Sequence, residues 1–152
     1  MGIIVVGVDG SGNSRGALDW ALNEARLRGS SVRAVHAWEI PVVGTGEAPW
    51  ALAPPPSYIE LSAKEIEQHT RDALDREVEE ALARVGVVID VERLVVEGPA
   101  GDAVIDAGAD AELVVVGSRG RGALKSLVLG SVSHHVVQHS ACPVVVVPTP
   151  AG

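Results

Sequence analysis

Short runs of aliphatic residues alternate along the chain with longer segments in which apolar residues recur at helical spacing. The runs predict five strands, at Ile3–Val8, Val32–Trp38, Val91–Val96, Leu113–Val116 and Val144–Val147. Near-continuous apolarity of this kind is typical of strands in a parallel sheet that is covered on both faces.

The segments between these strands predict four helices, each with apolar residues on one face. In the first two segments the apolar repeats run over Ala17–Ala25 and Ile66–Val85. The last two helices are expected at Pro99–Ile105 and Ser131–Ser140. Gly29 and Gly86 are the predicted stops of the first two helices, and Pro99 is expected in the first turn of the third. The alternation predicts an α/β domain with right-handed crossovers, and it leaves the strand order open.

Residues 39–57 lie outside this alternation and contain five prolines and two glycines. This composition predicts a long loop after the second strand, and loops of such length are often functional. No second domain is indicated, so residues 1–152 are expected to form one domain, a size in the ordinary range.

Composition narrows the class of protein further. Hydrophobic residues make up 47% and charged residues 21% of the chain, which excludes general disorder. The single cysteine, Cys142, excludes an intrachain disulfide. No apolar run approaches the ~18 residues of a membrane span, and the first residues lack the basic region of a signal peptide. The expected location is the cytoplasm.

The net charge of −8 disfavours binding to nucleic acid or to an anionic membrane. The charge is unevenly distributed, because residues 117–152 contain Arg119, Arg121 and Lys125 but no Asp or Glu. This basic segment follows the fourth predicted strand and is a candidate anion site.

Glycines and serines accompany these basic residues. Gly117, Gly120 and Gly122 follow the fourth strand, and glycine lets a backbone approach a ligand closely. The residues Gly130, Ser131 and Ser133 open the last helix, whose N-terminal amides suit phosphate. A phosphate site, preferably for a nucleotide, is therefore predicted, although an ordinary loop and helix cap would also explain the pattern.

Asp9 ends the first strand and is followed by Gly10 and Ser11. Its carboxylate could accept hydrogen bonds from a ribose or an adenine amino group, or could help to hold a metal. The alternative is a turn-forming Asp-Gly pair before a helix cap.

The spacing Gly117-x2-Gly120-x9-Gly130-Ser131 resembles the ATP-binding motif Gly-x2-Gly-x9-Gly-Ser/Thr of the universal stress protein family. The opening Ile4–Ser11, the position of His36 and the closing Cys142–Pro148 are also similar to that family. The resemblance spans the whole chain as one domain.

The resemblance implies a Rossmann-like nucleotide-binding fold, a five-stranded parallel sheet in order 3-2-1-4-5 with helices on both faces. Asp9 and Gly117 would then lie side by side. It also implies that Gly7 and Asp9 line the adenosine pocket and that the Ala37 backbone meets the adenine edge. Gly117 would lie near the ribose, and residues 118–123 with residues 130–133 would wrap the triphosphate. The implied nucleotide contacts are Gly7, Asp9, Ala37, Gly117, Ser118, Arg119, Gly120, Arg121, Gly122, Ala123, Gly130, Ser131, Val132 and Ser133.

The expected function is that of an ATP-binding regulator of the stress response, with Mg²⁺ bridging the phosphates. The family resemblance implies a homodimer formed through Val144–Val147. No general base with an orienting partner is visible, so fast catalysis is not expected. Slow hydrolysis, or autophosphorylation at Ser131 or Ser133, is a secondary hypothesis.

Other interpretations remain open. The chain could be an interaction module with a vestigial nucleotide site. Gly10-x-Gly12-x3-Gly16 with Glu39 departs from the spacing of a dinucleotide fingerprint. His135 and His139 have a spacing that can chelate metal, although no further ligand completes a site.

Overall fold

The structure, a computed structural model, describes residues 2–40, 56–119 and 129–148. For residues 56–61 it describes the backbone only. It contains five strands and four helices in alternation in this part of the chain. They are β1 (Ile3–Gly7), α1 (Gly12–Arg28), β2 (Ser31–Trp38), α3 (Pro56–Val85), β3 (Val91–Glu97), α4 (Ala100–Ala107), β4 (Leu113–Gly117), α5 (Ser131–His139) and β5 (Val144–Val147).

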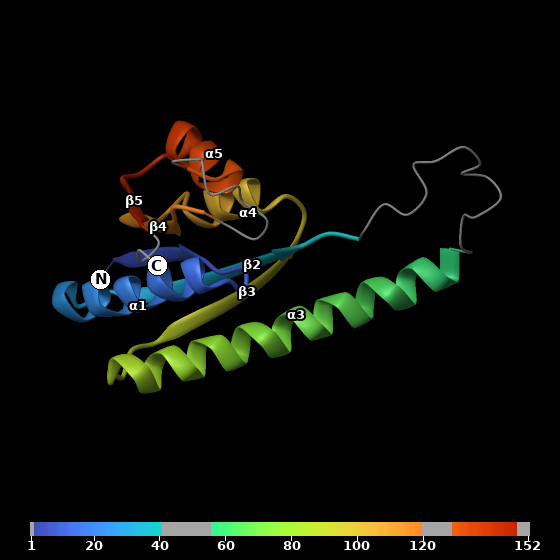
Figure 1. Ribbon diagram of the computed structural model, residues 1–152, viewed down its shortest axis with the longest axis horizontal. Helices are drawn as coiled ribbons and strands as arrows, with labels where there is room; N and C mark the ends of the chain where they lie inside the picture. The colour runs from blue at the N-terminus through green and yellow to red at the C-terminus, as the bar shows by residue number, and fades with distance from the viewer. Residues whose placement is uncertain (1, 41–55, 120–128, 149–152) are drawn as a thin grey trace.

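All the strands belong to one parallel sheet in the order β3-β2-β1-β4-β5. The helices α1 and α3 cover one face of the sheet, while α4 and α5 cover the other (Figure 1). The predicted fold class and the strand order implied by the family resemblance are confirmed. The continuous apolarity of the strands is explained by this arrangement, since successive side chains enter opposite cores.

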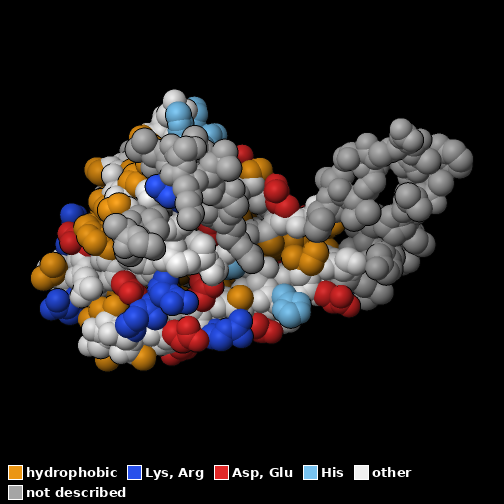
Figure 2. Space-filling model, viewed as in Figure 1, with side chains coloured by type: hydrophobic (Ala, Val, Ile, Leu, Met, Phe, Trp, Pro, Cys, Tyr) orange, Lys and Arg blue, Asp and Glu red, His pale blue; other side chains and the backbone are white. Residues whose placement is uncertain are grey.

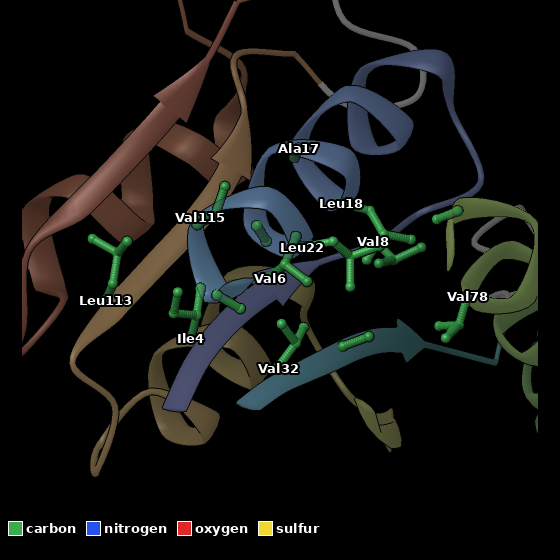
Figure 3. Close-up of a cluster of buried hydrophobic side chains, with 14 of the residues drawn as sticks. Ile4, Val6, Val8, Ala17, Leu18, Leu22, Val32, Val78, Leu113 and Val115 are labelled. Atoms are coloured by element: carbon green, nitrogen blue, oxygen red, sulfur yellow. The ribbon is translucent and has the colours of Figure 1, made fainter. Parts of the chain in front are cut away.

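The residues of β1 illustrate the two cores. Ile4 and Val6 pack under α1 and α3 with Leu18, Leu22 and neighbouring side chains (Figure 3). Val5 points to the opposite face, where the core is completed by residues of α4 and α5. All three β1 side chains are fully buried, so the central strand is held equally from both sides.

Glycines end two helices where the sequence predicts them. Gly29 follows α1 with φ +68°, and its N–H donates to the carbonyl of Ala25. Gly86 follows α3 with φ +75°, and its N–H donates to Leu82. A left-handed residue at this position is the usual helix stop, and it favours glycine.

Two predicted boundaries are wrong. The helix α3 begins at Pro56, so the predicted loop does not extend to Ser57 and the helix starts ten residues before Ile66. Proline is accepted at the first position of a helix, where its missing N–H has no intrahelical acceptor. Pro99 lies just before α4 rather than in its first turn, with an extended ψ of 135°. Residues 41–55 of the predicted loop lie outside the described residues.

The surface over α3 carries interleaved acidic and basic side chains (Figure 2). Arg84 pairs with Asp19 of α1 at 2.7 Å, and Arg93 of β3 pairs with Asp75 at 3.3 Å. Among the helices that the structure describes, none is apolar over a length sufficient to cross a membrane.

Candidate functional site

The centre of the sheet is a topological switch point. The strands β1 and β4 are neighbours, with Val6 opposite Val115, but the chain leaves them toward opposite faces. After β1 it enters α1 on one face, and after β4 it leads to α5 on the other. Ligands of open α/β sheets bind in the crevice that forms where the connections diverge. The two segments singled out in the sequence therefore meet at one edge.

Gly117 shows how closely these segments approach. A Cβ added at this residue would lie 2.9 Å from the carbonyl oxygen of Asn13 in α1. Gly117 is not among the described glycines with positive φ. Glycine is thus required here because the backbone of α1 passes close by, a requirement that exists without any ligand.

Asp9 lies in a turn that its own side chain stabilises. The N–H of Ser11 donates to Asp9 Oδ1 at 2.9 Å, and the N–H of Asp9 donates to Ser14 Oγ at 3.2 Å. Gly10 between them has φ +84°. The turn-forming role is therefore present. A ligand-binding role is compatible with it, since a carboxylate can accept several hydrogen bonds.

Ser118 fastens the start of α5 to the end of β4. Its N–H donates to Val147, and its carbonyl accepts from the N–H of Gly130 at 2.7 Å and from Ser133 Oγ at 3.0 Å. Ser118 and Gly130, twelve positions apart in the sequence, are therefore in direct contact. Gly120, Arg121, Gly122 and Ala123, which the resemblance places around the phosphates, lie outside the described residues.

The N-terminus of α5 has two different serines. Ser133 is 2% exposed, and its hydroxyl donates to the carbonyls of Ser118 and Gly130. Ser131, the first helical residue, is exposed. Gly130 occupies the cap position with φ −73° and ψ 172°, so no side chain caps the helix there. The first amides of a helix have no intrahelical acceptor, which leaves Ser131, Val132 and Ser133 able to donate from the backbone.

Arg119 adds a cationic group directly after Ser118, the residue that holds this helix start. Its Nε is shielded from solvent and has no hydrogen-bond partner among the described residues. A buried donor without an acceptor calls for an explanation, and a bound anion is one.

Gly7 and Ala37 were predicted near the adenosine. A Cβ on Gly7 would lie 3.1 Å from Val104 Cγ2, so this glycine permits close packing of α4 on β1. Ala37 is in β2 near its carboxyl end, opposite Val96 of β3. Both lie toward the edge that carries Asp9 and Gly117.

Glu77 is a neighbour of the site that the sequence did not reveal. Together with Gly10, Ser11, Arg15 and other residues of α1 and α3, it lines an open hollow in the surface. Burial raises the pKa of Glu77, and the negative charge of Asp9 raises it further, while Arg15 and Arg76 oppose the shift. Acidic residues are frequent along α3, so the sequence pattern did not distinguish this one.

Two histidines of α5 contact protein groups. His135 Nε2 lies 2.8 Å from Asp102 Oδ1 of α4, and the His135 and His139 rings are 4.7 Å apart. Within the described ranges, no group of three or more His, Cys, Asp or Glu residues is placed to hold a metal.

The strand order, the switch point and the helix start fastened to β4 define a Rossmann-like α/β domain. The model of the universal stress protein family matches residues 1–148, and the chain belongs to this family. The universal stress protein Rv2005c of Mycobacterium tuberculosis is 35% identical over 146 residues, which cover 95% of this chain and 47% of the relative. YxiE of Bacillus subtilis is 32% identical, with 95% and 97% covered. The chain thus spans about half the length of the mycobacterial relative and nearly all of the Bacillus one.

Solved structures agree with this assignment. A crystal structure of a universal stress protein in complex with cAMP has a TM-score of 0.66 at 25% identity, and 98% of each chain is covered. A universal stress protein from Archaeoglobus fulgidus has a TM-score of 0.58 at 27% identity, with 96% of this chain and 93% of that chain covered. The protein MJ0577, at 20% identity, shares the fold with a TM-score of 0.76, and 99% of this chain and 98% of that chain are covered.

Proposed function

We propose that the chain binds ATP at the carboxyl edge of β1 and β4 and regulates a stress response through the bound state. The observation that carries the proposal is the pair of hydrogen bonds accepted by the Ser118 carbonyl, from the Gly130 N–H and the Ser133 hydroxyl. These bonds hold the N-terminus of α5 beside β4. A helix start held at a switch point presents backbone donors where phosphate is favoured.

Each part of the nucleotide has a candidate partner. Asp9 would accept hydrogen bonds from the nucleoside, with Gly7 and the Ala37 backbone near the base. Gly117 and Ser118 would adjoin the ribose and first phosphate. The amides of Ser131–Ser133 and the buried Nε of Arg119 suit phosphate oxygens. Mg²⁺ bound to the phosphates would neutralise part of their charge, while the residues of the chain orient the nucleotide.

Adenine nucleotides are the ligand class that relatives support. Solved universal stress proteins are in complex with cAMP, dAMP and AMP, and the cAMP complex is 25% identical to this chain. Preference for the triphosphate rests on the glycine motif, part of which lies outside the described residues. The stress-response role and the cytoplasmic location rest on the family resemblance.

Calorimetric titration tests this proposal. The purified chain, stripped of carried-over nucleotide, is titrated with ATP, ADP, AMP, cAMP and NADPH, each with and without Mg²⁺. Saturable binding that is strongest for ATP with Mg²⁺ is expected. Tighter binding of NADPH than of ATP would favour the dinucleotide interpretation. If none of these nucleotides binds, the interaction-module interpretation is favoured.

Gly130→Val provides the matching variant. The backbone angles at Gly130, φ −73° and ψ 172°, are open to any residue. A branched side chain there would crowd the first amides of α5 without straining the backbone. Loss of ATP binding is the expected result, with the fold of the variant verified by circular dichroism. Retained affinity would show that the α5 amides do not bind the nucleotide.

We further propose that β5 pairs with β5 of a second copy. It lies at the edge of the sheet, and its four valines are only partly buried. An unpaired apolar edge is a liability that association would remove. Sedimentation velocity is expected to show a dimer that Val146→Lys dissociates. A wild-type monomer at micromolar concentration would contradict this.

If a phosphoryl group is transferred, we propose Ser131 as its acceptor in place of Ser133. Ser131 is exposed, whereas the Ser133 hydroxyl is buried and donates to two carbonyls. Ser131 Oγ would take the γ-phosphoryl of ATP, release its proton and leave ADP. Label from γ-labelled ATP that survives in Ser131→Ala would exclude this assignment.

A further inference from the structure

Glu77 of α3 lies against the turn that follows β1. An ideal Cβ placed on Gly10 would be 3.4 Å from Glu77 Oε1, which is ordinary van der Waals contact. The same turn carries Asp9, whose carboxylate accepts the N–H of Ser11. Two carboxylates, one in the turn and one on α3, therefore lie beside Gly10 at the edge where the nucleotide is proposed to bind.

Two other acidic residues of α3 near Glu77 have an ion-pair partner. Asp75 and Glu79 both pair with Arg93 of β3. Glu77 makes no ion pair with any residue that the structure describes, although it is half-buried. A half-buried carboxylate without an ion-pair partner is sensitive to any further charge brought close to it.

The charges that face Glu77 come from three parts of the chain. Asp9 contributes from the turn and Arg15 from α1, while Arg76 and Glu80 are on α3 itself. Arg84 also lines the hollow, but it is held by both carboxylate oxygens of Asp19. Burial and the charge of Asp9 both raise the pKa of Glu77, whereas Arg15 and Arg76 lower it. The net direction disfavours its charged form.

We propose that the protein takes up a proton at Glu77, beside the Asp9–Ser11 turn, when an anionic nucleotide binds at this edge of the sheet. This inference rests on the proposed nucleotide-binding function. An anion arriving at this edge adds negative charge near a carboxylate already beside Asp9. Protonation of Glu77 removes one of the repelling charges and leaves the hydrogen bond between Asp9 and Ser11 in place.

The consequence is a pH-dependent affinity. ATP binds more tightly as the pH falls toward the ordinary pKa of a glutamate, because the protonated fraction of Glu77 increases. Adenosine, which carries no charge, binds with little dependence on Glu77. The difference between the two ligands separates an effect of charge from a general loosening of the turn.

The test compares wild type with Glu77→Gln and with Glu65→Gln, titrated with ATP and with adenosine. Titrations at pH 6 in buffers of different ionisation enthalpy report the protons taken up on binding. Glu65 is exposed on the same helix about 18 Å away along its axis, so Glu65→Gln is the control for net charge. In Glu77→Gln we expect ATP affinity at pH 7 to rise about two- to five-fold, as removal of a nearby surface charge would cause.

The terminal phosphate of ATP also titrates at about pH 6, so the readout is the difference between variants: proton uptake in Glu77→Gln is smaller than in wild type, while Glu65→Gln retains the uptake of wild type. Glu77→Asp, which keeps the carboxylate, is expected to restore it, and far-UV circular dichroism verifies that each variant folds. Equal proton uptake in wild type and Glu77→Gln would overturn the role of Glu77 while leaving nucleotide binding intact. A parallel loss of ATP and adenosine affinity with an unchanged pH profile would reduce Glu77 to a structural residue. A wild type that binds no nucleotide would overturn the proposed function, and this inference with it.

Discussion

The two segments that meet at the switch point are stabilised in different ways. The turn after β1 is held by its own side chains, since Asp9, Ser11 and Ser14 satisfy one another. The start of α5 is held at the end of β4 chiefly through the backbone carbonyl of Ser118, which accepts from the Gly130 N–H and the Ser133 hydroxyl, and α5 starts at a glycine with no side-chain cap. The first segment is complete without a ligand, whereas the second retains donors that a ligand can use. We therefore expect the turn after β1 to keep its conformation when a nucleotide binds. Differences in affinity are expected to come from the amides of α5.

The largest expected effect is that of Gly117→Val, because it forces the two segments apart. Its Cβ would approach the Asn13 backbone to 2.9 Å, and backbone cannot rotate away as a side chain can. We expect a loss of about 1–3 kcal/mol in the free energy of unfolding, as is usual for overpacking. Urea denaturation measures it.

Gly12→Val is the matched control for this substitution, since a Cβ at Gly12 meets nothing within 4 Å. Equal stability of the two variants would contradict the close approach of α1 to β4.

Ser133→Ala is expected to loosen the second segment alone. The buried hydroxyl loses its bonds to the carbonyls of Ser118 and Gly130, which costs about 1 kcal/mol. The affinity for ATP should fall with it, because α5 is then held to Ser118 only through Gly130. Thermal unfolding and calorimetry measure the two quantities.

Ser131→Ala is the control for Ser133→Ala. Because the Ser131 side chain is exposed, this substitution should leave the melting temperature unchanged. If both alanine variants melt alike, the Ser118–Ser133 contact is not what holds the helix.

Asp9→Asn probes the first segment without dismantling it. An amide oxygen can still accept from Ser11, so the turn should persist and stability should change by less than about 0.5 kcal/mol. Loss of the charge is nevertheless expected to change nucleotide affinity. Asp9→Ala also removes the turn hydrogen bond, and comparison of the two variants by calorimetry separates these contributions. An Asn variant as unstable as the Ala variant would show that the charge supports the turn.

The smallest effect concerns the dependence of stability on pH. The pKa of Glu77 is raised above its ordinary value of 4.5, so the folded state binds more protons than the unfolded state just above that value. Stability must then fall as the pH rises through this window. Glu77→Gln should remove this slope and raise the melting temperature at pH 7 by about 1–2 °C. An unchanged slope in the variant would show that Glu77 does not cause it.

Most of the fold could be predicted from the sequence because its pattern is local. Strand positions follow from runs such as Ile3–Val8, and the stops at Gly29 and Gly86 follow from the conformation that glycine tolerates. The start of α3 could not be predicted, because prolines favour both a loop and the first turn of a helix. The strand order came from the resemblance, since pairing between distant segments leaves no local pattern.

The site could be predicted in part for the same reason. Asp9, Gly117 and Gly130 stand out by type and spacing, and the structure brings their segments together. The internal role of the Ser133 hydroxyl could not be foreseen, because it depends on the position of the Ser118 carbonyl. Glu77 was missed because only the packing of α3 against the turn distinguishes it from its acidic neighbours.

The contact between Gly117 and Asn13 also affects how the glycine motif can be used to infer ligands. A motif residue is diagnostic of a ligand only when the ligand is what forbids other residues. Here the main chain of α1 already forbids them, so we expect relatives that have lost nucleotide binding to retain this glycine. Gly130, whose backbone angles suit any residue, is the position where a substitution would mark such a loss.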